Sequence, residues 1–155
     1  MYAPFCTKAL ARRQIDGDQH FMAERTAKDM IVQLEAMGRS FQNVLILNDP
    51  CGTLQKHFPK ANIHKGIERT SLPFEDGSFD LVVDCMSWHW INDLPQALME
   101  IKRILSPQGL MLSGFFGEKT LTELRQAFLE QDLNVFQGAA QRVAPMAQAQ
   151  TLGEL

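Results

Sequence analysis

Residues 44–53 read Val44-Leu45-Ile46-Leu47-Asn48-Asp49-Pro50-Cys51-Gly52-Thr53, four aliphatic residues followed by a cluster of turn formers. A continuous aliphatic run of this length is typical of a strand that is buried on both faces of a parallel sheet. Asn, Asp, Pro and Gly are the residues that tight turns favour. The stretch therefore predicts a buried strand that runs into a tight turn and then into a short helix ending at about Phe58.

The same alternation of helix and strand continues on both sides of this stretch. A helix is expected from an N-cap at Asp18 to a C-cap at Gly38, because apolar residues recur between them at spacings of three and four. Its expected inner face consists of Ala23, Ala27, Met30, Ile31, Leu34 and Met37. Further strands are expected at 61–67, 79–85 and 110–116, and further helices from Asn92 or Asp93 to a turn at 106–109 and around 121–128. This order predicts an α/β fold, a Rossmann-like, doubly wound, mostly parallel sheet with helices on both faces.

Length and composition restrict the class of protein. A chain of 155 residues fits one domain, divided here into an N-terminal helical segment (1–42), a Rossmann-like core (43–137) and a partial C-terminal segment (138–155). The formal net charge of −3 argues against a nucleic-acid binder. No apolar run approaches the ~18 residues of a membrane span. The three cysteines form no C-x-x-C pair, so we expect a reducing compartment and neither a disulfide framework nor a zinc site.

Two stretches carry a family resemblance. Residues 72–83 (Leu72-Pro73-Phe74-Glu75-Asp76-Gly77-Ser78-Phe79-Asp80-Leu81-Val82-Val83) closely resemble the segment that enters the fourth strand of class I S-adenosylmethionine-dependent methyltransferases. Residues 97–109 resemble the helix and turn before the fifth strand of those enzymes. With the first strand and its turn, the resemblance covers roughly residues 20–135. It implies S-adenosylmethionine as cofactor and methyl transfer to an oxygen or nitrogen of a small-molecule or protein substrate.

The stretch after the expected fourth strand indicates which groups within this family the sequence resembles most. Residues 87–95 (Ser87-Trp88-His89-Trp90-Ile91-Asn92-Asp93-Leu94-Pro95) are similar to the carrier-protein O-methyltransferases of biotin synthesis and, more closely, to the methyltransferase-like assembly factors of respiratory complex I. Residues 116–125 and the basic start, Phe5 to Gln14, also resemble the second group, so we interpret that start as part of the folded protein. The second group implies two alternatives, a non-catalytic assembly factor acting on a respiratory-complex subunit and an arginine hydroxylase. The expected compartment is the bacterial cytoplasm or, alternatively, the mitochondrial matrix, and the oligomeric state is not predicted.

The turn at residues 48–54 is the expected cofactor site. The family pattern is an acid, an apolar residue and then Gly-Cys-Gly-Thr-Gly, and the resemblance places Asn48, Cys51, Gly52 and Thr53 against the cofactor. Pro50 and Leu54 stand where glycines are expected, and Asn48 stands where the acid is expected. Proline removes an amide, and leucine adds bulk where the cofactor approaches the backbone. The alternative is a turn that only links strand to helix.

The region around Glu68 departs further from the family. The resemblance places Glu68 and Arg69 on the adenine side of the cofactor. Glu68 lies only 16 positions after Gly52, whereas a strand–helix–strand unit needs about 30 residues. Either the second strand and its helix are lost, or a stretch is missing from the sequence. The second alternative predicts a gap far longer than the usual ~3.8 Å between consecutive Cα atoms somewhere between Ala61 and Gly66.

His89 is the candidate residue on the substrate side. As a neutral imidazole it can accept a proton from the substrate or orient the substrate. The alternative is a structural histidine packed between Trp88 and Trp90. Asp84 ends the expected fourth strand, where it either reaches the substrate or is a solvated strand end. The histidines show no ligand spacing, so no metal site is predicted. Cys51 is interpreted as a small packing residue as well as a cofactor contact.

The last residues contain fewer elements than the family requires. Such folds close with a sixth and a seventh strand, and the sequence ends in an apparent helix start at 151–155. We therefore expect an incomplete sheet, which a partner chain, a swapped segment or further sequence would complete.

Overall fold

The computed structural model describes residues 21–64, 66, 69–140, 142–144 and 146. The elements in order are α2 (Phe21–Ala36), β1 (Val44–Asn48), α3 (Thr53–His57), β2 (Asn62–Ile63), β3 (Phe79–Cys85), η2 (Trp88–Trp90), α4 (Leu94–Ile104), β4 (Leu105–Gly114) and α5 (Thr122–Phe136). None of the described helices is long and apolar enough to cross a membrane. The expected N-cap Asp18, the basic start and the helix start at 151–155 lie outside the described residues.

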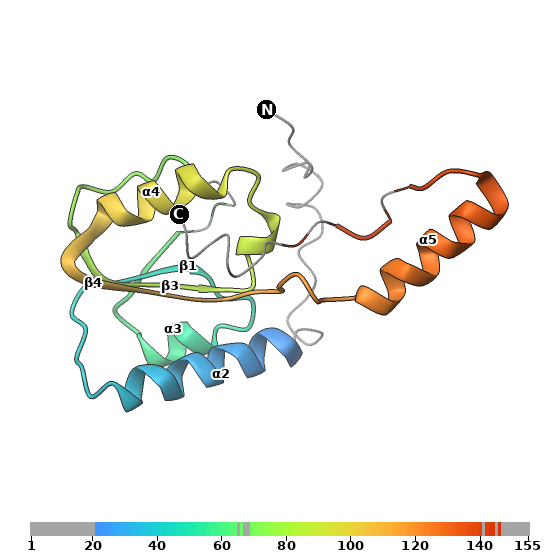
Figure 1. The fold of residues 1–155 in the computed structure, drawn as a ribbon. Coiled ribbons are helices and arrows are strands. Elements are labelled where there is room, and N and C mark those ends of the chain that lie inside the picture. Colours follow the sequence, from blue (N-terminus) through green and yellow to red (C-terminus); the bar gives the residue numbers. More distant parts are fainter. Residues whose placement is uncertain (1–20, 65, 67–68, 141, 145, 147–155) are drawn as a thin grey trace. The chain divides into compact units, whose positions relative to one another are not determined.

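The four described strands form one parallel sheet in the order β2-β1-β3-β4. Figure 1 shows this sheet edge-on, with α4 on one side and α2 and α3 on the other. β1 and β3 are the central pair, with Val44 opposite Leu81. Because the sequence order of the strands is not their spatial order, the chain crosses over the sheet between them, and helices cover both faces. The expected doubly wound α/β fold is confirmed.

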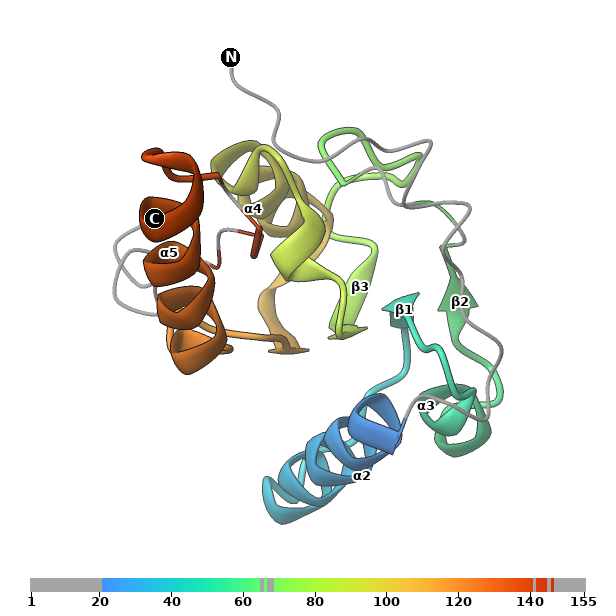
Figure 2. The same cartoon turned by 90° about the vertical axis from the view of Figure 1, so that its right-hand side faces the viewer.

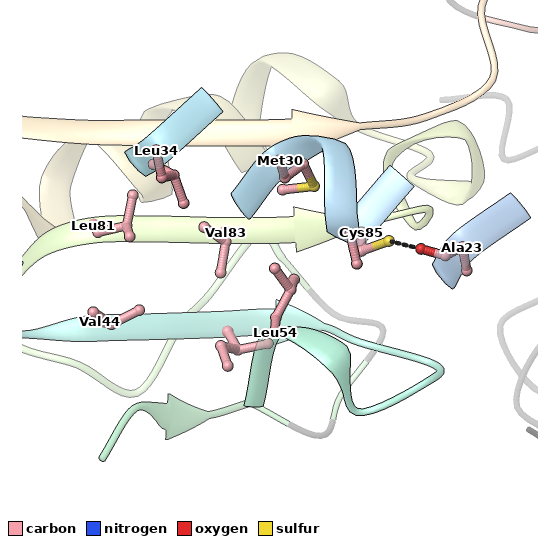
Figure 3. Packing of buried hydrophobic residues seen from close by; sticks show 10 residues of the cluster. Ala23, Met30, Leu34, Val44, Leu54, Leu81, Val83 and Cys85 are labelled. Carbon is pink, nitrogen blue, oxygen red and sulfur yellow. Dashed lines mark hydrogen bonds between the residues drawn. The ribbon is translucent and has the colours of Figure 1, made fainter. Parts of the chain in front are cut away.

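Alternation along the strands divides the core between the two faces. Val44, Ile46, Leu81 and Val83 pack with the inner residues of α2. Figure 3 shows three of them, Val44, Leu81 and Val83, beside Met30 and Leu34 of that helix. Their neighbours Leu45, Leu47 and Val82 pack on the opposite face with the apolar residues of α4. In Figure 2, where the carboxyl ends of the strands face the viewer, α2 and α3 lie on one side and α4 on the other. Burial on both faces explains why these strands are continuous aliphatic runs.

Most of the apolar face expected for α2 is confirmed, but Met37 does not belong to it. Ala23, Ala27, Met30 and Leu34 are buried, and Ile31 packs against the same cluster. Met37 was expected on this face but is 51% exposed. The helix ends at Ala36, and Gly38 adopts a left-handed φ of 60°, so the chain turns away before Met37 can reach the core.

The connection from β1 to β3 contains the second strand in a short form. Leu45 and Ile46 of β1 pair with Asn62 and Ile63 of β2, and α3 between them has only five residues. β2 is the strand expected at 61–67, reduced to two residues, so the expectation that the region of the second strand is short or missing is confirmed. That a longer stretch belongs between Ala61 and Gly66 stays a prediction, since Lys65 lies outside the described residues.

β4 begins earlier than the sequence suggested. Leu105 pairs with Phe79, but the next pair is Leu110 with Leu81, so four residues of β4 lie between these pairs where β3 has one. Residues 106–109 bulge out between these pairs. The Pro and Gly of this segment do form the expected break, but the break lies inside the strand and not before it. The strand also ends at Gly114, two residues before the expected end.

Residues from Phe116 onward form a second compact unit. Its helix α5 contains most of the helix expected around 121–128, and the apolar residues Leu121, Leu124 and Phe128 near its start are 49%, 43% and 38% exposed. The buried residue of this helix is Asp132, which accepts hydrogen bonds from the Arg142 guanidinium at 2.7–3.0 Å. The division into segments at 42 and 137 within one domain stays a prediction.

Gly114, the last residue of β4, provides a test of the packing between α2 and the sheet. A Cβ at Gly114 would overlap the Thr26 methyl. We expect Gly114→Ala to lower the free energy of unfolding by about 1–3 kcal/mol, and Gly114→Ala combined with Thr26→Ser to recover most of it. The measurement is urea unfolding. Gly117→Ala is the control, because a Cβ there meets nothing within 4 Å. Equal effects of the two alanine variants would contradict this packing.

Candidate functional site

The carboxyl ends of β1 and β3 bring together most of the candidate residues. Asn48, at the end of β1, pairs in register with Asp84 of β3 after an irregularity at residue 47. The Asn48 side chain donates a hydrogen bond from Nδ2 to the Cys85 carbonyl oxygen at 2.6 Å. Ligands of doubly wound sheets bind outside the carboxyl ends of the strands, so this edge is the candidate site.

Asp49 organises the turn after β1, a role that was not expected from the sequence. Its carboxylate accepts hydrogen bonds from the amides of Thr53 (3.1 Å) and Gln55 (2.8 Å), at the start of α3. The signal was present, since Asp is a preferred capping residue ahead of a helix. The two amides at this helix start are therefore satisfied by the chain's own carboxylate.

Gly52 and Leu54 decide how closely a ligand can approach the turn. Gly52 has a φ of +66°, and a Cβ built there would meet nothing within 4 Å, so its backbone faces open space. Leu54 was expected to add bulk at the cofactor position, but its side chain is fully buried in the core beneath α2. That expectation is wrong, because Leu54 points from α3 into the sheet–helix interface (Figure 3).

The described cysteines show the environment of packing residues. Cys51 is partly buried and lies against the core cluster, and burial together with the nearby Asp49 raises the pKa of its thiol. Burial also raises the pKa of Cys85 to about 12. Both are thiols at neutral pH, which disfavours a nucleophilic role. Within the described ranges, no group of three or more His, Cys, Asp or Glu side chains comes together to hold a metal ion.

Arg69 is directed into the protein. Its side chain is 2% exposed and forms an ion pair with the fully buried Asp84, with 3.6 Å between Nη2 and Oδ2. Nη2 also donates to the Leu47 carbonyl oxygen at 2.8 Å, and Nη1 donates to the Gly66 carbonyl oxygen. A direct contact with a cofactor would require these bonds to break. Glu68, the other residue expected on the adenine side, lies outside the described residues.

Asp84 is not a solvated strand end, because it has no exposed surface. Burial raises the pKa of its carboxyl, and the hydrogen bonds from Ser87 and the charge of Arg69 oppose that rise. Oδ1 accepts a hydrogen bond from the Ser87 amide at 3.1 Å, and Oδ2 accepts one from the Ser87 hydroxyl. Asp84 therefore links the end of β3 to the residue that precedes η2.

His89 lies in η2, between the two tryptophans of the sequence. It is 5% exposed, and its ring centroid lies 4.8 Å from that of Trp90 at an interplanar angle of 51°. Trp88 is 2% exposed and belongs to the core cluster that includes Leu45 and Leu47. Burial lowers the pKa of His89 from 6.5 to about 4, so the imidazole is neutral at pH 7. Both interpretations of His89, packed structural residue and substrate-side residue, fit this environment.

The chain is similar in sequence to known proteins of one family. The family model described as "Methyltransferase domain" matches residues 32–113. The mitochondrial arginine-hydroxylase NDUFAF5 is 35% identical over 121 residues in Mus musculus and 34% identical in Homo sapiens, in each case across 78% of this chain. The chain spans 35% and 34% of the length of those two relatives. The malonyl-[acyl-carrier protein] O-methyltransferase of Halorhodospira halophila is 43% identical over 60 residues, 39% of this chain and 20% of that protein.

Solved structures show the same fold at low sequence identity. A S-adenosylmethionine-dependent methyltransferase from Thermotoga maritima, a possible histamine N-methyltransferase, superposes with a TM-score of 0.57 at 17% identity, over 88% of this chain and 72% of its own. The YcgJ protein of Bacillus subtilis gives a TM-score of 0.55 at 16% identity, over 84% and 65%. At these identities the likeness establishes the fold alone.

The buried His89 predicts a pH dependence of stability. The unfolded chain takes up a proton near pH 6.5, whereas the folded chain does so only near pH 4. The free energy of unfolding should therefore fall by about 3 kcal/mol as the pH drops from 6.5 to 4, with no further loss from this group below pH 4. Urea unfolding at several pH values measures it.

The matched control for this prediction is His57, which is exposed on α3. His89→Gln should flatten the fall in stability between pH 6.5 and pH 4, and His57→Gln should keep the wild-type curve. A His89→Gln protein with the wild-type pH dependence would show that His89 is not neutral and buried.

Proposed function

Since the chain belongs to the methyltransferase domain family, we propose that it binds S-adenosylmethionine at the carboxyl ends of β1 and β3 and transfers the methyl group to an oxygen or nitrogen of a small-molecule or protein substrate. The observation that carries the proposal is the open backbone at Gly52, which leaves room for a cofactor against the turn. The burial of Leu54 supports it, because the leucine leaves that space clear.

Four residues of the turn are proposed to contact the cofactor. Gly52 allows close approach to the backbone, and Cys51 and Thr53 flank it. Asn48 donates its amide to Cys85, which leaves its side-chain oxygen to accept a hydrogen bond from an ammonium group. Glu68 is proposed for the adenine side, and Arg69 supports that side from within the protein. The bound cofactor supplies an activated methyl group on a sulfonium, so the chain's own task is to position the reactants.

His89 is proposed as the residue that orients the substrate. A general base works best when its pKa lies near the working pH. The pKa of His89 is lowered to about 4 by burial, which makes it a weak base at pH 7. A neutral imidazole still donates and accepts hydrogen bonds, so orientation is the role that its environment favours.

The turn can be tested by titration calorimetry with S-adenosylhomocysteine. We expect one-to-one binding in the micromolar range, about −8 kcal/mol. Gly52→Ala should lower the affinity about tenfold, because a methyl group would occupy the space where a ligand meets the backbone. Gly38→Ala is a matched control. Gly38 also has a left-handed φ, +60°, and also faces open space, but it follows the end of α2 and is not part of the turn after β1.

Both alanine variants should lose a similar, small amount of stability, about 1 kcal/mol. Only Gly52→Ala should lose affinity. If both variants bind like the wild type, the turn is a structural link and does not contact the cofactor.

A non-catalytic assembly factor is the second candidate, and one observation favours it. The Asp49 carboxylate already accepts the hydrogen bonds of two amides at the start of α3, and Pro50 has no amide hydrogen to donate. The turn therefore has few hydrogen-bond donors left for the carboxylate of a cofactor. In this case the partner would be a protein, such as a respiratory-complex subunit, in the bacterial cytoplasm or the mitochondrial matrix. Arginine hydroxylation, the activity in the name of the mitochondrial relatives, is a third candidate.

Asp49→Ala distinguishes the first two candidates. It frees the amides of Thr53 and Gln55, so it should lower stability by about 1 kcal/mol and raise the affinity for S-adenosylhomocysteine if the cofactor carboxylate uses those amides. Asp80→Ala is the control, because Asp80 likewise accepts two amides, those of Gln42 and Asn43, at 2.8 and 3.0 Å. Failure of both the wild type and Asp49→Ala to bind, in folded samples, would favour the assembly factor.

A further inference from the structure

Arg69 joins four segments of the chain at the candidate site. Its guanidinium donates to the carbonyl oxygens of Gly66, in the connection after β2, and Leu47, at the end of β1. It also lies 3.6 Å from the Asp84 carboxylate on β3 and 3.5 Å from the Ser87 hydroxyl before η2. A planar guanidinium can satisfy several acceptors in fixed directions at once, which a lysine ammonium cannot do with the same geometry.

The burial of this pair argues against a role in stability alone. Arg69 is 2% exposed and Asp84 is fully buried. Removing both charges from water offsets most of their attraction, so a buried ion pair contributes little net stability compared with apolar residues of similar size. What such a pair does provide is a defined arrangement of the segments that it joins.

The segment fixed most directly is η2. The Ser87 amide and hydroxyl both donate to the Asp84 carboxylate, and Ser87 immediately precedes Trp88–Trp90. Two hydrogen bonds that tie the start of η2 to β3 thus end on one carboxylate, and Arg69 holds that carboxylate from the other side. His89 is carried by this short helix.

We propose that Arg69 is a positioning residue which, through Asp84 and Ser87, fixes η2 at the carboxyl ends of β1 and β3. The consequence for substrate binding at His89 rests on the proposed function, whereas the positioning of η2 does not. The ion pair of Arg69 with Asp84 also links the connection after β2 to η2. A change at Arg69 should therefore alter the surroundings of the tryptophans that η2 carries.

The protein offers a direct readout, because both tryptophans of the sequence lie in η2. We expect Arg69→Lys to shift the tryptophan emission to longer wavelength and to increase quenching by acrylamide. The melting temperature should also fall, because a lysine leaves some of these buried acceptors without a donor. Affinity for S-adenosylhomocysteine should fall about tenfold, which corresponds to about 1.4 kcal/mol, because Arg69 also holds Leu47 next to the turn.

Arg103→Lys is the matched control. Arg103 also holds the connection between β2 and β3, through the carbonyl oxygens of Leu72 and Phe74 at 3.0 and 2.8 Å. Its ion pairs are with Asp76 and Glu100, and none of these bonds involves η2. The same substitution there should leave the tryptophan emission unchanged.

Ser87→Ala keeps the test decisive if Arg69→Lys does not fold. It removes one hydroxyl bond to Asp84 and should shift the emission in the same direction. Ser78→Ala is its control: it removes the Ser78 hydroxyl bond to the Glu75 carbonyl oxygen at 2.6 Å and should leave the emission unchanged. Unchanged emission in folded Arg69→Lys or, failing that, in Ser87→Ala overturns the proposal, and so does an equal shift in Arg103→Lys. If the wild type binds no S-adenosylhomocysteine and Arg69→Lys still shifts the emission, the positioning role is supported and the proposed function is contradicted.

Discussion

The parallel pairing of β1 with β3 is the constraint on which the rest of the structure depends. These two strands are buried on both faces, so each must place alternate side chains under α2 and under α4. A shift of one residue in register would exchange the two sets of side chains. The pairing also fixes where the strands end, and it places Asn48 opposite Asp84. Every candidate residue that the structure describes is positioned from these two strand ends.

Polar groups at this edge are satisfied mainly by one another. Asn48 bonds to Cys85, Asp49 to the amides of α3, and Asp84 to Arg69 and Ser87. A buried polar group without a partner costs about 1–3 kcal/mol, so this internal pairing is required when no ligand is present. It also means that a ligand must either use groups that remain open, such as the backbone at Gly52, or replace bonds that already exist.

The sequence predicted the features that periodicity determines and missed those that depend on contacts between distant residues. The strands at 44–48 and 79–85 and the capping of α4 by Asp93 could be predicted, because aliphatic runs and capping residues are local signals. The burial of Leu54 could not be predicted. Leu54 stands where the family pattern has a glycine, and that pattern does not indicate in which direction a larger side chain will point. The inward direction of Arg69 was missed for the same reason: its partner Asp84 lies 15 positions away and only the fold brings the two together.

Asp49 occupies amides that the proposed cofactor could also use. Replacing a capping side chain typically costs about 1 kcal/mol, and the Asp49 carboxylate accepts hydrogen bonds from two amides. If the carboxylate of a cofactor needs the same amides, displacing Asp49 would weaken binding by about a factor of ten. If the cofactor is held through Gly52 and Asn48 instead, the bonds of Asp49 remain intact and fix the turn in the conformation that the ligand meets. In either case the proposed affinity of this turn depends on Asp49, which either competes for the two amides or holds the turn in the shape that the ligand meets.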